Sequence, residues 1–360
     1  MYAMSNCLKK VCILGASGYT GAELLRLLTN HPQFEVSAVT GSKSAGESLT
    51  ALCPHLQGYE GLRISPETDT AKLAAECDLL FCALPHGQAM RILPGLTAAR
   101  MIDLGGDFRL DSAAAYETWY GEAHSAPSEL GRWVYGLCEL NREKICTASR
   151  IANPGCYATA SILAAAPLMQ HELAEPDLII SAVSGLSGAG KTLKAELHFA
   201  HAFEDVRAYK IGAHQHIPEI EQALNTITRA ANCSSDNCSS GKVLLSFTPH
   251  LVPMTRGIHV TLIARARPGV TQDMVREAYD TTYKNARFVK VTGAPSGTKE
   301  VRGGNGAKLY PVLDQRTGKI VVTAVIDNLV KGAAGQALQN ANLMFGLDEG
   351  LGLTQGGLYP

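Results

Sequence analysis

Short apolar runs that alternate with helical stretches place the strongest constraint on how this chain can fold. Residues 10–14, 34–40, 78–84 and 100–104 are strand-like runs, and residues 22–28 between the first two have helical character. Continuous apolar strands separated by helices are typical of a parallel sheet that is covered on both faces. The first 150 residues are therefore predicted to form an α/β domain built on a doubly wound parallel sheet.

A glycine-rich turn separates the first predicted strand from the first predicted helix. Glycines at such a turn allow a tight bend, the close approach of a pyrophosphate, and close packing of the helix on the strand. The spacing is GxxGxxG instead of GxGxxG, and a purely structural turn is the alternative. The preceding strand and the following leucines favour a dinucleotide site, whose predicted residues are Gly15, Ser17, Gly18, Tyr19, Thr20 and Gly21.

The end of the second predicted strand indicates which dinucleotide is bound. NAD-dependent enzymes commonly carry an acidic residue there, which binds the 2′-hydroxyl of the ribose. This chain instead has Ser42 and Lys43 after Thr40 and Gly41, so hydroxyls and a cation occupy that position. Such groups suit a 2′-phosphate, and the sequence therefore favours NADPH/NADP over NAD as the cofactor.

A second turn, Asn153-Pro154-Gly155-Cys156, predicts a reactive cysteine. Asn-Pro-Gly is turn chemistry, and the stretch leads into residues 160–166, a good helix-forming segment. The thiol of Cys156 is thus expected at a helix N-terminus, where backbone amides and the helix dipole favour a thiolate. The same amides could hold an oxyanion formed when the sulfur attacks a carbonyl carbon. The alternative is a buried structural cysteine.

Two histidines, His214 and His216, are candidates for the acid/base partner of Cys156. Gly212 and Pro218 bracket their segment, which is predicted to be a loop that leads into a helix through residues 222–224. Either imidazole could take the thiol proton and later protonate an oxyanion. The His-x-His pattern also occurs in metal sites, but no further ligand at a metal-binding spacing accompanies it, so no metal is expected.

Residues 185–192 satisfy the P-loop pattern GxxxxGK[ST] and follow the strand-like run 178–183. A P-loop phosphoryl-transfer enzyme is therefore an alternative from another class, with Asp327 as its metal-binding partner. That alternative leaves the N-terminal glycine turn and the cysteine turn unexplained. The simpler interpretation is that Ser187, Gly188 and Lys191 line a phosphate or cofactor site through backbone amides.

The composition argues against several classes of partner. The 32 Lys and Arg residues balance 33 Asp and Glu residues, so no basic field for nucleic acid is expected. No apolar run approaches the length of a membrane span or of a signal-peptide core. Ten cysteines without a CxxC pair are typical of thiols kept reduced in the cytoplasm. Cys233 and Cys238 lie in a polar segment that is predicted to be a surface loop without chemistry.

Taken together, these segments resemble those of the N-acetyl-gamma-glutamyl-phosphate reductase family, the acyl-phosphate reductases of arginine biosynthesis. The combination of Asn-Pro-Gly-Cys-Tyr with Ser-Gly-x-Ser-Gly-Ala-Gly-Lys is the most specific part of the resemblance. Aspartate-semialdehyde dehydrogenases share the architecture, but their cysteine and histidine segments differ. The matching segments cover nearly the whole chain in order, at residues 15–21, 83–87, 103–109, 135–139, 153–157, 184–191, 214–216, 248–254 and 327–335.

The resemblance implies two domains. A Rossmann-type NADP-binding domain is expected at residues 1–155, completed by residues 328–360. An inserted α+β domain for catalysis and oligomerisation is expected at residues 156–327, in a homodimer or homotetramer. The runs 243–248 and 258–266 fit strands of this second domain, 272–283 fits a helix, and 329–345 fits the helix that returns to the first domain.

The activity implied by the resemblance is NADPH-dependent reduction of the small-molecule acyl phosphate N-acetyl-gamma-glutamyl phosphate to N-acetylglutamate 5-semialdehyde. Cys156 would form a thioester as phosphate leaves, and His216, with His214 as the alternate, would act as acid and base. Dehydrogenases of aspartate semialdehyde or of an N-acetyl-aminoadipate homologue are the alternatives, because selectivity for chain length depends on the shape of the pocket.

The resemblance also implies roles for residues that local patterns do not single out. Asn328 is expected near the nicotinamide, and Pro85 and His86 near the middle of the cofactor. Arg109 and Arg256 are candidates for binding the anionic groups of the substrate, because a guanidinium can bind carboxylate or phosphate oxygens bidentately. The remaining predicted substrate-binding residues are Asn153 and Tyr209.

Overall fold

The computed structural model describes residues 8–232 and 241–359, which divide into two compact units. Unit 1 comprises residues 8–117, 122–154 and 333–354, and unit 2 comprises 118–121, 155–332 and 355–359. Residues 328–332 and 355–359 therefore group with unit 2, whereas the sequence assigned them to the first domain. Cys233 and Cys238, predicted to lie in a surface loop, fall outside the described residues.

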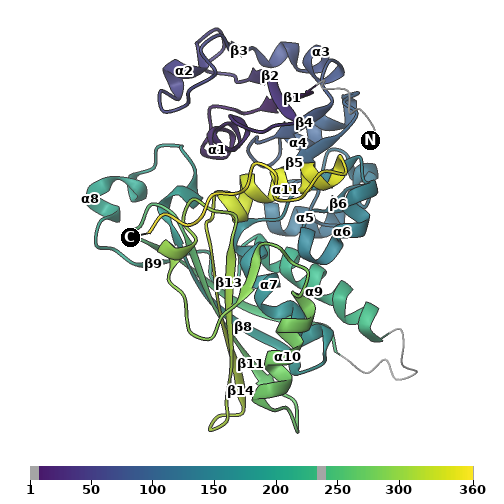
Figure 1. Cartoon of the computed structure of the whole chain (residues 1–360), viewed down its shortest axis with the longest axis vertical. Coiled ribbons are helices and arrows are strands. Elements are labelled where there is room, and N and C mark those ends of the chain that lie inside the picture. The colour runs from purple at the N-terminus through teal and green to yellow at the C-terminus, as the bar shows by residue number, and fades with distance from the viewer. Residues whose placement is uncertain (1–7, 233–240, 360) are drawn as a thin grey trace. The chain divides into compact units, whose positions relative to one another are not determined.

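Unit 1 is built on a parallel sheet of seven strands in the order β3-β2-β1-β4-β5-β7-β6 (Figure 1). The chain crosses over between β1 and β4, and ligands of doubly wound sheets bind at the carboxyl ends of the strands at such a point. The predicted fold class is confirmed. The strands are β1 (Lys9–Leu14), β2 (Phe34–Thr40), β3 (Ile64–Ser65), β4 (Leu79–Cys82), β5 (Met101–Asp103), β6 (Val134–Tyr135) and β7 (Arg150–Ala152).

Helices pack on this sheet through apolar faces, as the leucines of the first helix illustrate. Leu24, Leu25 and Leu28 of α1 (Tyr19–Leu28) are buried. The last helix, α11 (Gly335–Met344), packs against α1 and α6 (Cys138–Thr147), so a segment far along the chain completes unit 1. The remaining helices are α2 (Leu49–Leu52), α3 (Thr70–Ala75), α4 (Ala89–Ile92) and α5 (Ala113–Tyr120).

Unit 2 contains a mixed sheet in the order β12-β13-β14-β11-β8-β10-β9. The central strand β8 runs parallel to β10 and antiparallel to β11, with Ile180 paired to Phe247 and Leu262. These three side chains are buried, whereas their sequence neighbours face away from the core. The strands are β8 (Ala174–Gly185), β9 (Arg207–Ala208), β10 (Leu244–Val252), β11 (Ile258–Ala266), β12 (Val289–Val291), β13 (Ala307–Asp314) and β14 (Lys319–Ile326).

Helices α7 (Cys156–Gln170), α9 (His216–Asn232) and α10 (Gln272–Thr282) cover one face of this sheet, and α8 (Phe199–Ala202) is a short outer helix (Figure 1). α7 is apolar on all sides, and residues 157–169 are all buried. The hydroxyls of Tyr279 and Tyr283 donate to the carbonyls of Ala164 and Leu163 in the middle of α7. A helix enclosed in this way gives its N-terminal residue a rigid support.

Most predicted element bounds agree with the structure, and two helices differ. β2 and β11 have the predicted bounds. α9 begins at His216, so His216 and Pro218 lie in a helix instead of the predicted loop. Proline fits the first helical turn because an N–H there would have no partner within the helix. The predicted helix 329–345 opens as a π-helical turn, Val330–Ala334, before α11 begins.

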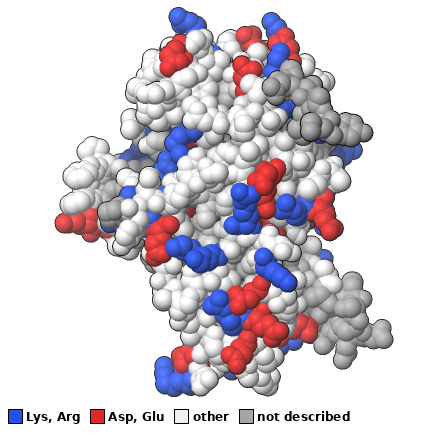
Figure 2. Space-filling view, in the orientation of Figure 1, with Lys and Arg blue, Asp and Glu red and all other residues white. Residues whose placement is uncertain are grey.

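Charges are mixed on the surface, and Figure 2 shows Lys and Arg side chains lying among Asp and Glu side chains. Within residues 8–232 and 241–359, no helix is both long and apolar enough to cross a bilayer. The described cysteines form no disulfide among themselves; they are Cys12, Cys53, Cys77, Cys82, Cys138, Cys146 and Cys156.

Candidate active site

Cys156 is the first residue of α7, as the turn chemistry predicted. Gly155 is the N-cap, in an extended conformation with φ −69° and ψ 154°. Because glycine has no side chain, no side-chain cap covers the first-turn amides, which can stabilise negative charge on or near the sulfur. The Cys156 side chain is half-buried, whereas Cys12 and Cys82 are buried in the sheet. Burial raises the pKa of the Cys12 thiol to about 12.

The imidazole of His216 lies against Gly155, the residue before the cysteine. A Cβ atom added to Gly155 would lie 2.7 Å from His216 Cε1 and even closer to Nε2. The φ of Gly155 is one that any residue adopts, so this contact is what requires glycine here. α7 and α9 pack together, and their first residues are Cys156 and His216. The structure therefore brings the predicted nucleophile and acid/base together.

Glu219 connects the same two helices. It lies in the first turn of α9, and its Oε1 accepts the backbone N–H of Gly155 at 2.8 Å. The Glu219 side chain is 1% exposed, so the bond is shielded from water. Loss of this buried acceptor would leave the N–H of Gly155 without its partner. Glu219 thus restrains the turn before Cys156 relative to the helix that carries His216.

His214 is enclosed by aromatic rings. Its ring centroid lies 5.6 Å from that of Tyr157, 5.7 Å from that of Tyr209 and 5.5 Å from that of Phe247. Its Nδ1 accepts the backbone N–H of His216 at 3.2 Å, so this nitrogen carries no proton in this arrangement. His214 therefore caps the start of α9. This geometry favours His216 as the acid/base, a choice that the sequence left open.

The hydroxyls of Tyr157 and Tyr209 form a short chain of hydrogen bonds. Tyr157 donates to the carbonyl oxygen of His250 at 3.1 Å, and Tyr209 donates to the hydroxyl oxygen of Tyr157 at 3.4 Å. Burial raises the pKa of Tyr209 to about 12 and raises that of Tyr157 well above its ordinary value. Both hydroxyls therefore stay protonated near neutral pH, beside the histidine pair.

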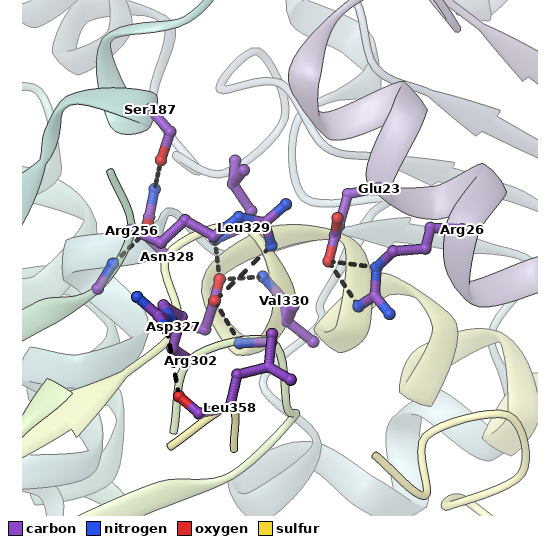
Figure 3. A network of polar contacts seen from close by, with 12 residues as sticks. Glu23, Arg26, Ser187, Arg256, Arg302, Asp327, Asn328, Leu329, Val330 and Leu358 are labelled. Carbon is purple, nitrogen blue, oxygen red and sulfur yellow. Dashed lines mark hydrogen bonds and ion pairs between the residues drawn. The ribbon is translucent and has the colours of Figure 1, made fainter. Parts of the chain in front are cut away.

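Asp327, which follows β14, organises a polar network in unit 2 (Figure 3). Its carboxylate is completely buried and accepts the N–H of Gly303 through Oδ2 at 2.7 Å. Oδ1 accepts the N–H groups of Leu329 at 2.8 Å and Val330 at 3.0 Å. Arg256 Nη1 lies 3.7 Å from Oδ2, and its side chain is 28% exposed. The ion pair therefore orients a guanidinium that still reaches solvent.

Asn328 joins residues that were predicted to bind the cofactor. Its Oδ1 accepts the N–H of Gly257 at 2.8 Å, and its Nδ2 donates to the hydroxyl of Ser187 at 2.9 Å. Gly188 lies beside this pair, since a Cβ added to it would be 3.8 Å from Asn328 Nδ2. Within unit 2 the structure therefore brings together Ser187, Gly188 and Asn328.

Residues 185–192 do not form a P-loop. Gly185 ends β8, Leu186–Ala189 form a 3₁₀ turn, and no helix begins at Lys191. The amides of residues 186 and 187 donate to the carbonyls of Met254 and Thr255 instead of facing a phosphate. The P-loop alternative is therefore wrong. The amide of Ser187 is also occupied, and its hydroxyl, which accepts from Asn328 Nδ2, keeps its own hydrogen for donation to a ligand.

In unit 1, residues 15–21 connect β1 to α1. Gly15 has a φ of +79°, and a Cβ added to it would lie 2.6 Å from the carbonyl oxygen of Ala83. A Cβ at Gly21 would lie 2.5 Å from the carbonyl oxygen of Gly15, so packing requires both glycines. A Cβ at Gly18, the N-cap of α1, would meet that oxygen at an ordinary 3.6 Å. The helix N-terminus, which has no acidic residue in its first turn, therefore fits an anionic pyrophosphate.

Other predicted cofactor residues lie at the same edge of this sheet. The carboxyl ends of β1, β2 and β4 share one edge because these strands are parallel. Ser42 and Lys43 are exposed after β2, and Pro85 and His86 are exposed after β4. The N–H of Gly106 donates to His86 Nδ1 at 2.9 Å, which fixes that ring. These residues and the glycine turn thus form one candidate dinucleotide site.

Arg109 and Asn153, which were predicted to bind substrate, make internal contacts in unit 1. Arg109 is 5% exposed, and its Nε donates to the carbonyl oxygen of Asn153 at 2.8 Å. Asn153 is completely buried; its Nδ2 donates to the carbonyl oxygen of Ala333 at 3.1 Å. The Oδ1 of Asn153 accepts a hydrogen bond from Asn340 Nδ2 at 3.0 Å. These bonds favour a structural role for Arg109 and Asn153, which is to hold the turn before Cys156.

Three residues at or beside the site were missed by sequence reasoning. Glu219 and Gly332 lie in segments that were singled out, but neither had a predicted role. A Cβ added to Gly332 would lie 2.7 Å from the Cβ of Cys156. Asp103, at the end of β5, is completely buried; desolvation and the nearby Asp107 raise its pKa to about 7. The sequence feature that could have identified Asp103 is its position at the carboxyl end of a predicted buried strand.

Comparisons with known proteins agree with this geometry. Residues 10–148 match the semialdehyde dehydrogenase NAD binding domain, and residues 156–328 match the semialdehyde dehydrogenase dimerisation domain. The N-acetyl-gamma-glutamyl-phosphate reductase of Desulforudis audaxviator is 44% identical over 98% of this chain and 99% of its own. The reductase of that name from Syntrophobacter fumaroxidans is 45% identical with the same coverage.

Solved structures of aspartate semialdehyde dehydrogenases share the fold. The Vibrio cholerae enzyme II, complexed with ASA, has a TM-score of 0.70 at 16% identity, covering 94% of this chain and 98% of that one. The Candida albicans enzyme, solved with NADP, has a TM-score of 0.64 at 16% identity, covering 94% and 99%. Identity this low shows the fold alone, whereas the full-length sequence matches show the family. The chain belongs to the N-acetyl-gamma-glutamyl-phosphate reductase family of semialdehyde dehydrogenases.

Proposed function

We propose that this chain catalyses the NADPH-dependent reduction of N-acetyl-gamma-glutamyl phosphate to N-acetylglutamate 5-semialdehyde and phosphate. The observation that carries the proposal is the position of Cys156 at the start of α7, next to a glycine covered by the His216 ring. The relatives named for this activity, which match nearly the full length of the chain, support the choice of substrate.

Cys156 is the proposed nucleophile. Its sulfur bonds to the γ-carbonyl carbon, the bond from that carbon to the phosphate oxygen breaks, and a thioester remains. The first-turn amides of α7 stabilise the oxyanion that forms during this exchange. His216 takes the thiol proton as the sulfur attacks and delivers it to the departing phosphate. The chemistry needs a reduced thiol, which fits the predicted cytoplasmic location.

The second half-reaction releases the aldehyde. When bound, NADPH would supply the hydride that reduces the thioester carbon. The oxygen of the resulting tetrahedral group is negatively charged and again faces the amides at the start of α7. Its collapse breaks the carbon–sulfur bond and frees the semialdehyde, and His216 then passes a solvent proton to the Cys156 thiolate. One proton is consumed in each turnover.

Residues of unit 1 are proposed to select NADPH and to bind its phosphates. The turn from Gly15 to Gly21 and the N-terminus of α1 suit the pyrophosphate. Ser42 and Lys43 are exposed at the end of β2, where a 2′-phosphate would need polar and cationic partners. Ser187, Gly188 and Asn328, which were also predicted to bind the cofactor, form one cluster within unit 2.

Arg256 is the proposed anchor for an anionic group of the substrate. Its guanidinium is oriented by Asp327 yet remains partly exposed, which a binding cation requires. Tyr209 is the second proposed substrate contact, because its hydroxyl stays protonated and can donate a hydrogen bond. Arg109 and Asn153 are assigned the task of holding the turn that precedes Cys156.

A second copy of the chain is the proposed partner of unit 2. On the sheet face opposite α7, α9 and α10, Ile179 is 51% exposed and pairs with Ser246 and Ile263 in the neighbouring strands. The match to a dimerisation domain over residues 156–328 supports a homodimer through this face. We expect Ile179→Asp to yield monomers in light scattering, whereas a dimer with unchanged affinity would contradict the assignment.

The proposed substrate is tested by the reverse reaction. Purified protein, NADP and phosphate are combined with N-acetylglutamate 5-semialdehyde, aspartate semialdehyde or the N-acetyl-aminoadipate homologue, and NADPH absorbance is followed. The highest kcat/KM is expected with N-acetylglutamate 5-semialdehyde. A preference for either other aldehyde would reassign the substrate within the same chemistry.

The role of the nucleophile is tested by Cys156→Ala, with the exposed Cys146→Ala as a matched control. Cys156→Ala should abolish turnover while NADPH binding survives, and Cys146→Ala should leave both unchanged. Normal turnover by Cys156→Ala would refute the mechanism.

A further inference from the structure

Residues 355–359 pack along residues 300–304 in unit 2. The backbone N–H of Leu358 donates to the carbonyl oxygen of Arg302 at 2.7 Å, and Arg302 Nη2 donates to the carbonyl oxygen of Leu358 at 3.4 Å (Figure 3). The two segments therefore lie side by side although about 50 residues of sequence separate them. Residues 355–359 are called the strap below.

Glycines on both sides allow the strap to approach so closely. A Cβ added to Gly357 would lie 2.5 Å from the carbonyl carbon of Glu300 and closer still to its oxygen. A Cβ added to Gly304 would lie 2.8 Å from the carbonyl oxygen of Gln355. Neither Gly304 nor Gly357 has a positive φ, so the close approach of backbone to backbone is what requires glycine.

The segment under the strap is bonded to the buried carboxylate of Asp327. The N–H of Gly303 donates to Asp327 Oδ2 at 2.7 Å, and Arg256 Nη1 lies 3.7 Å from the same oxygen. Asp327 is completely buried, so the loss of a donor would leave this oxygen short of partners. The position of residues 300–304 therefore influences where the Arg256 guanidinium lies.

The turn that Asp327 begins ends against the nucleophile. Its backbone carbonyl accepts the N–H of Gly332 at 2.9 Å, which closes the turn. A Cβ added to Gly332 would lie 2.7 Å from the Cβ of Cys156 and 3.1 Å from its Cα. A shift of this turn toward the nucleophile would therefore move Cys156 itself, because there is no space between them.

We propose that the strap is a positioning element of the active site: by holding residues 300–304 against Asp327, it sets the positions of Arg256 and Cys156. This inference rests on the proposed function for its kinetic consequence. Displacing the strap removes the Gly303 amide from Asp327, weakens the restraint on Arg256 and loosens the turn at Gly332. Small displacements of groups that hold a substrate cost large factors in rate.

The chain offers a matched pair of variants on each side of the contact. Gly357→Ala forces a Cβ into the backbone of Glu300, whereas a Cβ at the adjacent Gly356 would meet nothing within 4 Å. Gly304→Ala forces a Cβ against Gln355, whereas a Cβ at Gly306 would also meet nothing within 4 Å. Within each pair, both variants add one methyl group, and the two substituted glycines are close together in the chain.

The experiment measures kcat/KM for the acyl phosphate, the Kd of NADPH, and the rate at which iodoacetamide alkylates Cys156, mapped by mass spectrometry. Gly357→Ala and Gly304→Ala are expected to lower kcat/KM about tenfold or more and to change the alkylation rate of Cys156. The Kd of NADPH and the alkylation rate of the exposed Cys146 should stay unchanged in all four variants. Gly356→Ala and Gly306→Ala should behave as the parent chain.

Equal kcat/KM and equal alkylation of Cys156 in Gly357→Ala and Gly356→Ala would overturn the proposal. Gly304→Ala provides the same comparison with Gly306→Ala if Gly357→Ala fails to fold. A parent chain that reduces no acyl phosphate would instead refute the proposed function. In that case the alkylation rates, which need no turnover, still decide whether the strap positions Cys156.

Discussion

The carboxylate of Glu219 accepts the backbone N–H of Gly155 at 2.8 Å, and this bond ties the residue before the nucleophile to α9. The same helix begins with His216, whose ring covers Gly155. One helix therefore carries both the proposed acid/base and the residue that restrains the turn before Cys156.

We expect Glu219→Ala to lower kcat about ten- to a hundredfold, because the N–H of Gly155 loses its buried acceptor and the turn can shift. Glu219→Gln retains an oxygen acceptor and should keep most of the activity. Glu221→Ala is the control, since Glu221 accepts the N–H of Leu245 at 3.0 Å from the same helix but is not bonded to the turn. Equal kcat for Glu219→Ala and Glu221→Ala would contradict a positioning role.

Gly155→Ala should separate folding from catalysis. The added Cβ meets the tip of the His216 ring, which can rotate away, so the melting temperature should change little. The displaced imidazole would lose its place beside the residue that precedes Cys156, and kcat should fall about a hundredfold or more. Gly297→Ala is a matched control, because Gly297 is also an extended N-cap and its Cβ would make an ordinary 3.9 Å contact. An active Gly155→Ala variant would mean that His216 is not the acid/base.

Substitution by asparagine distinguishes the two histidines. His216→Asn removes the proposed acid/base, and we expect kcat/KM to fall by about 10²–10⁴. In His214→Asn the new side-chain oxygen can still accept the N–H of residue 216, so the start of α9 is preserved and the loss should be below about tenfold. A larger loss of kcat/KM in His214→Asn than in His216→Asn would assign the role to His214.

Much of the fold could be predicted because local patterns decide it. The bounds of β2 and β11 follow from their β-rich and alternating apolar runs. The position of Cys156 at the start of α7 follows from Asn-Pro-Gly, which stops the preceding strand and leaves a glycine at the N-cap. The start of α9 could not be predicted from the local pattern, because a proline such as Pro218 occurs both in loops and in the first turn of a helix.

Some parts of the site could not be predicted from the sequence, because they depend on contacts between residues that are far apart in the chain. Arg109 carries the charge of an anion anchor, yet its Nε bonds to the backbone of Asn153, and no local pattern reveals that contact. Glu219 resembles any acidic residue in a first helical turn until α7 is packed beside it. Gly357 can lie this close to the backbone of Glu300 only because it has no side chain. The sequence does not show which residue lies opposite this glycine.

Asp103 should make the stability of the protein depend on pH. Burial, with a contribution from Asp107, raises the pKa of its carboxyl to about 7 in the folded chain, against an ordinary value of 3.8. The folded state therefore binds more protons than the unfolded state between these values, and the free energy of unfolding falls as pH rises through that window. Below this pH window Asp103 is protonated in both the folded and the unfolded chain, and above it Asp103 is ionised in both. The contribution of Asp103 to the free energy of unfolding is therefore constant outside the window.

Asp103→Asn removes this titration while keeping an oxygen that can accept the N–H of Gly105. The variant should gain stability relative to the parent as pH rises from about 4 to about 7, by up to about 4 kcal/mol at 1.36 kcal/mol per pKa unit. Urea unfolding at several pH values measures the difference. Asp69→Asn is the control, because Asp69 is exposed and makes no capping hydrogen bond. A pH-independent difference between parent and Asp103→Asn would show that Asp103 is ionised across the whole range.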